Sequence, residues 1–158
     1  FPRHSTDEKN MTAKSTSRSA ARLAAVQALF QHQMEKTPVT KLIKEFHDHR
    51  LGKEIEDDQY HPAEGDFFDD LVIGVTSRLE EIDGLVDSKL AKGWTLGRLD
   101  KTMLQILRCG TFELVAYDDV PIATVIDEYL DVAHAFFNKK DAGFVNGLLD
   151  SIAKQVRG

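Results

Sequence analysis

The stretch Ala142-Gly-Phe-Val-Asn-Gly-Leu-Leu-Asp-Ser151 decides the fold class of this chain. Apolar residues in and just after it recur at helical spacing: Phe144, Val145, Leu148, Leu149, Ile152 and Val156. Gly147 interrupts this run, and a glycine inside a helix costs about 1 kcal/mol relative to alanine. We therefore expect Gly147 to let the last helix approach a neighbour closely. Asn146 is expected to satisfy polar groups at that crossing.

The same spacing predicts six further helices upstream of this stretch. They are expected at about residues 18–34, 42–51, 63–78, 82–90, 97–117 and 121–137. The helix at 121–137 has the widest apolar face and is expected in the middle of the bundle. No segment shows the alternation of a strand. The sequence therefore predicts an all-α fold, a compact bundle of about seven helices.

Residues 1–17 differ from the rest of the chain in composition. They are rich in Ser, Thr and Lys and show no apolar period, which is typical of disorder. We expect residues 1–17 to be a disordered basic N-terminal arm, and residues 18–158 to form a single all-helical domain.

Charge is distributed unevenly along the chain. The net charge is −6, but residues 1–30 hold five basic and two acidic side chains, which leaves −9 for the remainder. A basic arm on an acidic body suits a protein that meets an anionic ligand at one end and a basic partner elsewhere. The alternative is a basic tail that only keeps the protein soluble.

The sequence contains no motif that indicates catalysis, a cofactor or a metal. Cys109 is the only cysteine, which excludes a disulfide framework and a cysteine-rich zinc site and favours a reducing, cytoplasmic location. It lies in the middle of a predicted helix and is expected to be inert core. No apolar run is long enough to span a bilayer. We expect a protein that is not an enzyme and does not enter a membrane.

Cations near the start of the first helix are the first binding candidates. Arg18 and Arg22 are four residues apart and share a helix face, and Lys14 lies just upstream. Backbone N–H groups at a helix start also favour phosphate. Two arginines and a lysine are a weak signal on their own.

Four stretches resemble the NusB family of bacterial transcription antitermination factors, over roughly residues 18–157. They are Arg22-Leu-Ala-Ala-Val-Gln-Ala-Leu-Phe30, Ile106-Leu-Arg-Cys-Gly-Thr-Phe-Glu-Leu114, Val120-Pro-Ile-Ala-Thr-Val-Ile-Asp-Glu128 and Gly143-Phe-Val-Asn-Gly-Leu-Leu-Asp150. The last two are specific in their order and separation.

The resemblance implies a non-enzymatic protein of two packed helical subdomains. Family members bind boxA RNA together with NusE, a small-subunit ribosomal protein, and help RNA polymerase in an antitermination complex to read through terminators of ribosomal RNA genes. An arginine-rich start of the first helix touches the RNA, which implies contacts for Arg18 and Arg22. Ser19 and Ala20 stand where some members have arginines, and Lys14 is expected to supply part of the missing charge.

The turn before the last helix is the second candidate RNA contact. Lys139 and Lys140 lie at a helix N-terminus, where the macrodipole disfavours cations unless they face an anion. Phe136 and Phe144 flank this turn and could stack on unpaired bases. For the aromatic residues, helical spacing favours the hydrophobic core as the alternative.

Two other functions remain open at this point. A similar helical domain precedes the catalytic domain of ribosomal RNA cytosine methyltransferases. Some members of the NusB family also self-associate, so the chain could form a homodimer with an occluded RNA face.

Overall fold

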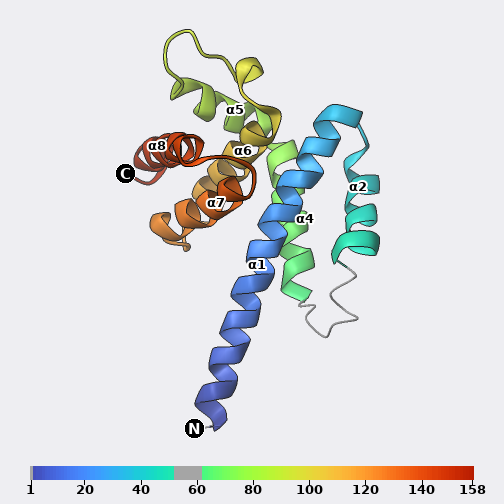
Figure 1. The fold of residues 1–158 in the computed structure, drawn as a ribbon. Coiled ribbons are helices and arrows are strands. Elements are labelled where there is room, and N and C mark those ends of the chain that lie inside the picture. The colour runs from blue at the N-terminus through green and yellow to red at the C-terminus, as the bar shows by residue number, and fades with distance from the viewer. Residues whose placement is uncertain (1, 52–61) are drawn as a thin grey trace. The chain divides into compact units, whose positions relative to one another are not determined.

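The computed structural model describes residues 2–51 and 62–158, and the side chains of residues 18–49 and 64–158. Its α-helices are α1 (Pro2–Glu35), α2 (Val39–Phe46), α4 (Pro62–Ser77), α5 (Leu79–Ser88), α6 (Lys101–Ala116), α7 (Ile122–Phe136) and α8 (Lys139–Arg157) (Figure 1). A π-helix, η1 (His47–Leu51), follows α2, and a 3-10 helix, η2 (Leu96–Arg98), precedes α6. The described residues contain no strand. The prediction of an all-α fold with about seven helices is confirmed.

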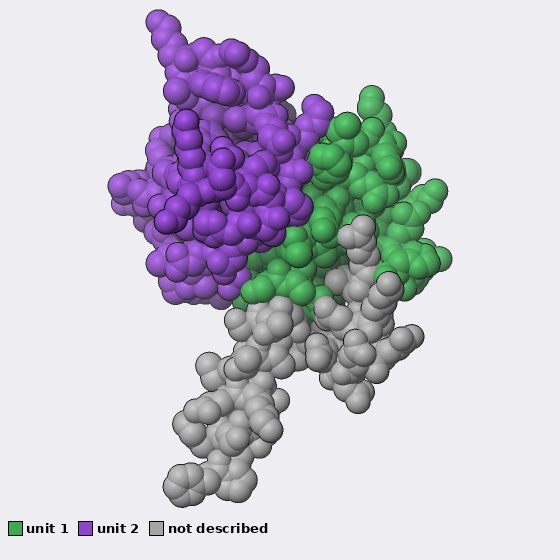
Figure 2. Space-filling model, in the orientation of Figure 1, with its two compact units in different colours: residues 1–72 green, residues 73–158 purple. Residues whose placement is uncertain are grey.

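The chain divides into two units, Phe1–Val72 and Ile73–Gly158 (Figure 2). The boundary falls inside α4, so this helix contributes to both units. The division into two helical subdomains agrees with what the family resemblance implies.

Unit 1 is built around the pairing of α1 with α2. Small residues on α1 allow close packing, and Ala21, Ala25 and Ala28 are completely buried. Phe46 on α2 stacks on Phe68 of α4, with ring centroids 5.4 Å apart.

The N-terminal residues are helical in the structure, which differs from the expectation. Because α1 begins at Pro2, residues 2–17 form the first part of a helix in the structure. The sequence predicts a disordered arm for residues 1–17. Its disorder in the free protein in solution stays a prediction.

Unit 2 is organised around α6, which packs against α5, α7 and α8. Helix α8 also contacts both α7 and α5 (Figure 1). Burial on α6 is nearly continuous from Met103 to Leu114, whereas α7 buries a stripe of five residues. The expectation that residues 121–137 lie in the middle of the bundle was therefore wrong, because α6 takes that place.

The close approach in unit 2 occurs at Gly110 on α6. A Cβ atom at Gly110 would lie 2.9 Å from Leu149 Cδ1 of α8. Gly147 on α8 is exposed, and a Cβ atom there would have no neighbour within 4 Å. The role expected of Gly147 was wrong, because the glycine that admits the neighbouring helix is on α6. Asn146 is exposed as well, so it lies outside this crossing.

Side chains fix where helices begin in unit 2. Asp100 caps α6 by accepting hydrogen bonds from Thr102 N (2.8 Å) and Met103 N (3.1 Å). Because of this cap and η2, α6 begins four residues later than the pattern predicts. Asn138 caps α8 in the same way by accepting from Asp141 N at 3.0 Å.

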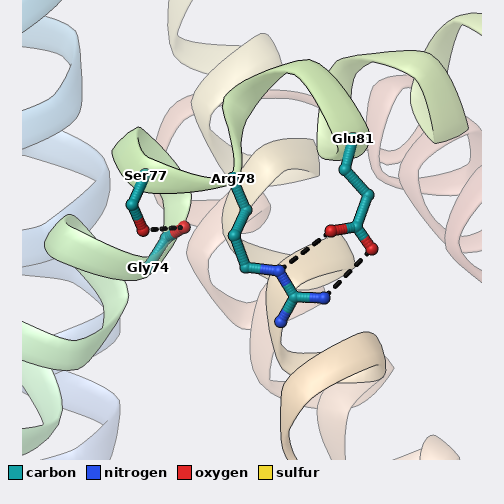
Figure 3. A network of polar contacts seen from close by, with 4 residues as sticks. All are labelled: Gly74, Ser77, Arg78 and Glu81. Carbon is teal, nitrogen blue, oxygen red and sulfur yellow. Dashed lines mark hydrogen bonds and ion pairs between the residues drawn. The ribbon is translucent and has the colours of Figure 1, made fainter.

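The junction of α4 and α5 is held by two local contacts (Figure 3). Ser77 Oγ donates to the Gly74 carbonyl at 3.3 Å. Arg78 donates from Nε and Nη2 to the two carboxylate oxygens of Glu81, at 2.9 and 3.0 Å. This hydrogen-bonded pair also raises the pKa of Arg78 above its usual value. Both partners are exposed, so its contribution to stability is small.

Candidate nucleic-acid interface

The two arginines of α1 stack on one aromatic ring of α4. The guanidinium carbon of Arg22 lies 5.0 Å from the centroid of Phe67, and that of Arg18 lies 5.3 Å from the same centroid. Both distances are within the range of cation–π attraction. The prediction that Arg18 and Arg22 share a helix face is confirmed.

Burial separates the two arginines. Arg22 is only 3% exposed, so it holds α1 against α4 and cannot present its guanidinium to a phosphate without moving. Arg18 is half-buried and retains access to solvent. Lys14 belongs to α1, but its side chain lies outside the described part of the chain. Among the three predicted cations of unit 1, Arg18 is the one whose described side chain can reach a ligand.

The second candidate surface lies where α7 ends and α8 begins, within unit 2. Lys139 and Lys140 are the first residues of α8, and both are exposed. Phe136, the last residue of α7, is 43% exposed, and Phe144 on α8 is 40% exposed. The alternative that these two rings belong to the hydrophobic core was therefore wrong. Residues such as Val145 fill the buried stripe of α8, which leaves Phe144 at its solvent-facing edge.

A pocket of about 640 Å3 lies beside this surface and is formed entirely by unit 2. Lys140 and Phe144 line it from α8, and Trp94 and Arg98 line it from the segment between α5 and α6. Sequence reasoning missed the pocket because Trp94 lies between the predicted helices 82–90 and 97–117, where the apolar pattern gives it no role. The signal that could have found it is the lone tryptophan four residues before an arginine, between two predicted helices and at the start of the second.

Cys109 and Glu113 are buried in α6 and take part in structural contacts. Cys109 is buried as predicted, and burial raises the pKa of its thiol, with a further rise from Glu113 and an opposing effect of Arg108. Tyr129 donates its hydroxyl hydrogen to Glu113 Oε1 at 2.5 Å. Among the described residues, no cluster of three metal-ligating side chains occurs, and no helix has the length and hydropathy to cross a membrane.

The candidate residues therefore form one set in each unit. Arg18 and Arg22 belong to unit 1, together with the backbone position of Lys14. The turn between α7 and α8 brings Phe136, Lys139 and Lys140 together in unit 2, with Phe144 on the following turn. Cations beside exposed aromatic rings suit phosphates and unpaired bases.

Comparisons with known proteins identify relatives that match most of this chain. The sequence profile described as the NusB family matches residues 19–154. A transcription antitermination protein NusB from Sphingopyxis alaskensis is 59% identical over 147 residues, which cover 93% of this chain and 99% of that protein. The protein of the same name from Novosphingobium aromaticivorans is 64% identical over 140 residues, covering 89% and 95%.

Solved structures share the fold. The structure of T. maritima NusB matches with a TM-score of 0.72 and 32% identity, covering 87% of this chain and 91% of that one. A crystal structure of antitermination factors NusB and NusE in complex with double-stranded RNA matches with a TM-score of 0.74. Its identity is 24%, and it covers 89% of this chain and 98% of the matched chain, so it supports the fold alone.

Proposed function

This chain belongs to the NusB family, and we propose that it acts in transcription antitermination by binding boxA-type single-stranded RNA together with NusE. In this role it is a cytoplasmic, non-catalytic adaptor that joins the RNA polymerase antitermination complex and supports ribosomal RNA transcription. The two relatives that carry the name of an antitermination protein are matched over nearly their whole length, which favours this function over that of a methyltransferase domain.

The observation that carries the RNA-binding part is the turn between α7 and α8. Lys139 and Lys140 are exposed there although the helix macrodipole disfavours cations at an N-terminus. A bound phosphate would offset this repulsion. The rings of Phe136 and Phe144 are exposed to water beside the lysines, which is unfavourable for apolar side chains. Stacking on unpaired bases would remove these rings from water. Arg18 is the RNA contact that we propose in unit 1, with Lys14 beside it along the chain.

The proposal that NusE is a partner rests on the charge of this chain and on a complex of the family. A solved family complex contains NusB with NusE and RNA, which makes these two ligands the first to test. The chain has a net charge of −6, and an acidic body speeds encounter with a basic ribosomal protein. RNA and NusE would then bind the same protein through surfaces of different charge.

The test measures the affinity for a fluorescently labelled boxA RNA with and without NusE, across salt concentrations. We expect binding that NusE strengthens and that weakens steeply as salt rises, because phosphate contacts release counterions. An RNA of the same length and scrambled sequence is the control. Equal affinity for both RNAs in the presence of NusE would reject boxA recognition.

Self-association is tested in the same samples. Sedimentation with and without RNA distinguishes a monomer that binds RNA from a homodimer that hides its RNA face. A stable dimer that RNA does not dissociate would point to storage or regulation instead of direct antitermination.

A further inference from the structure

The pocket of about 640 Å3 in unit 2 has walls of three elements. The segment after α5 supplies Trp94 and Arg98, the start of α6 supplies Asp100 and Met103, and α8 supplies Lys140 and Phe144. Its volume lies within the range of ligand-binding pockets, roughly 300–1,000 Å3. Its lining is mainly apolar, with charged groups at a few positions. This composition suits a flat, apolar ligand that carries a charge.

Trp94 is exposed but held in place. It is 52% exposed, and the guanidinium carbon of Arg98 lies 5.2 Å from its ring centroid. Arg98 Nη1 also donates to the carbonyl of Gly93 at 2.8 Å, which fixes the arginine. Gly93 has φ +90°, a backbone conformation that glycine adopts without strain, and Trp94 N donates to the Ala91 carbonyl at 3.0 Å. A ring positioned in advance loses less entropy when a ligand stacks on it.

The charge around Trp94 is opposite to that of the protein. Residues 89–101 hold four basic side chains and one acidic side chain, although the whole chain has a net charge of −6. On the α8 side of the pocket, Lys140 stands next to Asp141, so the lining itself holds two cations (Arg98 and Lys140) and two carboxylates (Asp100 and Asp141). The excess of cations in residues 89–101 favours phosphates along this segment, and the two carboxylates of the pocket can accept hydrogen bonds from the amino groups of a base.

We infer that this pocket takes one unpaired nucleobase of the bound single-stranded RNA, stacked on Trp94, with the adjoining phosphates beside Arg98 and Lys140. The inference rests on the proposed RNA-binding function and extends its surface from the turn before α8 to the segment after α5. Phe144 joins the two parts, because it belongs to that surface and also lines the pocket.

The experiment uses the fact that Trp94 is the only tryptophan in the chain. The full chain, with NusE lacking tryptophan, is titrated with unlabelled boxA RNA while Trp94 fluorescence is recorded. The anisotropy of a labelled RNA gives the affinity independently. We expect RNA to quench Trp94, Trp94→Ala to bind roughly 5- to 150-fold more weakly, and Trp94→Phe to bind within about threefold of the wild type.

Ile73→Ala is the matched control, since Ile73 is an exposed apolar residue of the same unit with 50% exposure and does not line the pocket. We expect its RNA affinity to equal that of the wild type. Recovery of affinity in Trp94→Phe separates stacking from a folding defect, because both Trp94 variants remove the same indole.

The outcomes separate this inference from the proposed function. RNA binding without quenching, and with Trp94→Ala as tight as the wild type, overturns the pocket and leaves the function standing. If NusE alone quenches Trp94, and Trp94→Ala weakens only the affinity for NusE, the inference is overturned in favour of a protein interface. No RNA binding under any condition overturns both.

Discussion

A methyl group added at Gly110 would meet Leu149 Cδ1 at 2.9 Å and Cδ2 at 3.0 Å. Leu149 is completely buried and cannot swing away freely. We expect Gly110→Ala to lower the free energy of unfolding by about 1–3 kcal/mol through overpacking. Gly147→Ala on α8 is the matched change in open space, and we expect it to raise stability by up to about 1 kcal/mol. Urea unfolding measures both, and a Gly110→Ala variant as stable as Gly147→Ala would contradict the proposed crossing.

The two arginines of α1 should separate stability from binding. Arg22 is buried over Phe67, so Arg22→Ala should reduce the free energy of unfolding by about 2 kcal/mol, through lost packing and cation–π attraction. Arg18→Ala should cost less stability and reduce RNA affinity more. Urea unfolding and RNA anisotropy on the same samples measure these effects. If Arg22→Ala kept full stability but lost RNA affinity, Arg22 would be a direct contact.

At the residue scale, the sequence predicts which side chains share a face but not what covers that face. The spacing of Arg18 and Arg22 places them together, and only the structure reveals that Phe67 of α4 lies under both. Helical spacing likewise cannot distinguish the centre of an apolar stripe from its edge. For this reason Phe136 and Phe144 resembled core residues, although both are exposed.

At the element scale, Arg157 joins the end of α8 to the end of α6. Its guanidinium donates to the carbonyl oxygens of Leu114 (2.9 Å), Val120 (2.5 Å), Tyr117 (2.6 Å) and Glu113 (3.3 Å). The last carbonyls of a helix have no partner within the helix. Arg157 therefore satisfies the end of α6 and fixes the loop that leads to α7.

We expect Arg157→Ala to reduce the free energy of unfolding by about 2–4 kcal/mol, because half-buried carbonyls would lose a charged donor. Lys154→Ala, one turn earlier on α8, is the control. Its ammonium forms an exposed ion pair with Asp150 at 3.0 Å, which should contribute less than about 0.5 kcal/mol. Equal losses for the two variants, measured by urea unfolding, would show that Arg157 does not act as a clamp.

The apolar pattern predicts that each helix exists but not which helix is central. Residues 121–137 show the wider apolar face, yet α6 is more deeply buried. The reason is that α6 buries polar residues, including Gln105 and Glu113. Glu113 tolerates burial because Tyr129 donates a hydrogen bond to it. A pairing between two helices cannot be detected from hydropathy along one of them.

At the scale of the whole molecule, an RNA-binding function has to be reconciled with a net charge of −6. The two are compatible because the proposed RNA contacts are confined to small cationic sites. Lys139 and Lys140 form one small cationic site, the segment 89–101 forms another, and residues 1–30 hold five basic and two acidic side chains, whereas the remainder of the chain is acidic. Affinity for RNA should therefore depend on a few named cations and not on the overall charge.

The most direct test measures how the affinity for boxA RNA, with NusE present, changes with salt in Lys139→Gln/Lys140→Gln. Each phosphate contact on a single strand contributes about 0.7 to the slope of log K against log salt concentration. We predict a slope shallower by about 1.4 in the double variant and an unchanged slope in the control Lys154→Gln, whose lysine is exposed on the same helix. A slope and an affinity equal to those of the wild type would contradict RNA binding at the start of α8.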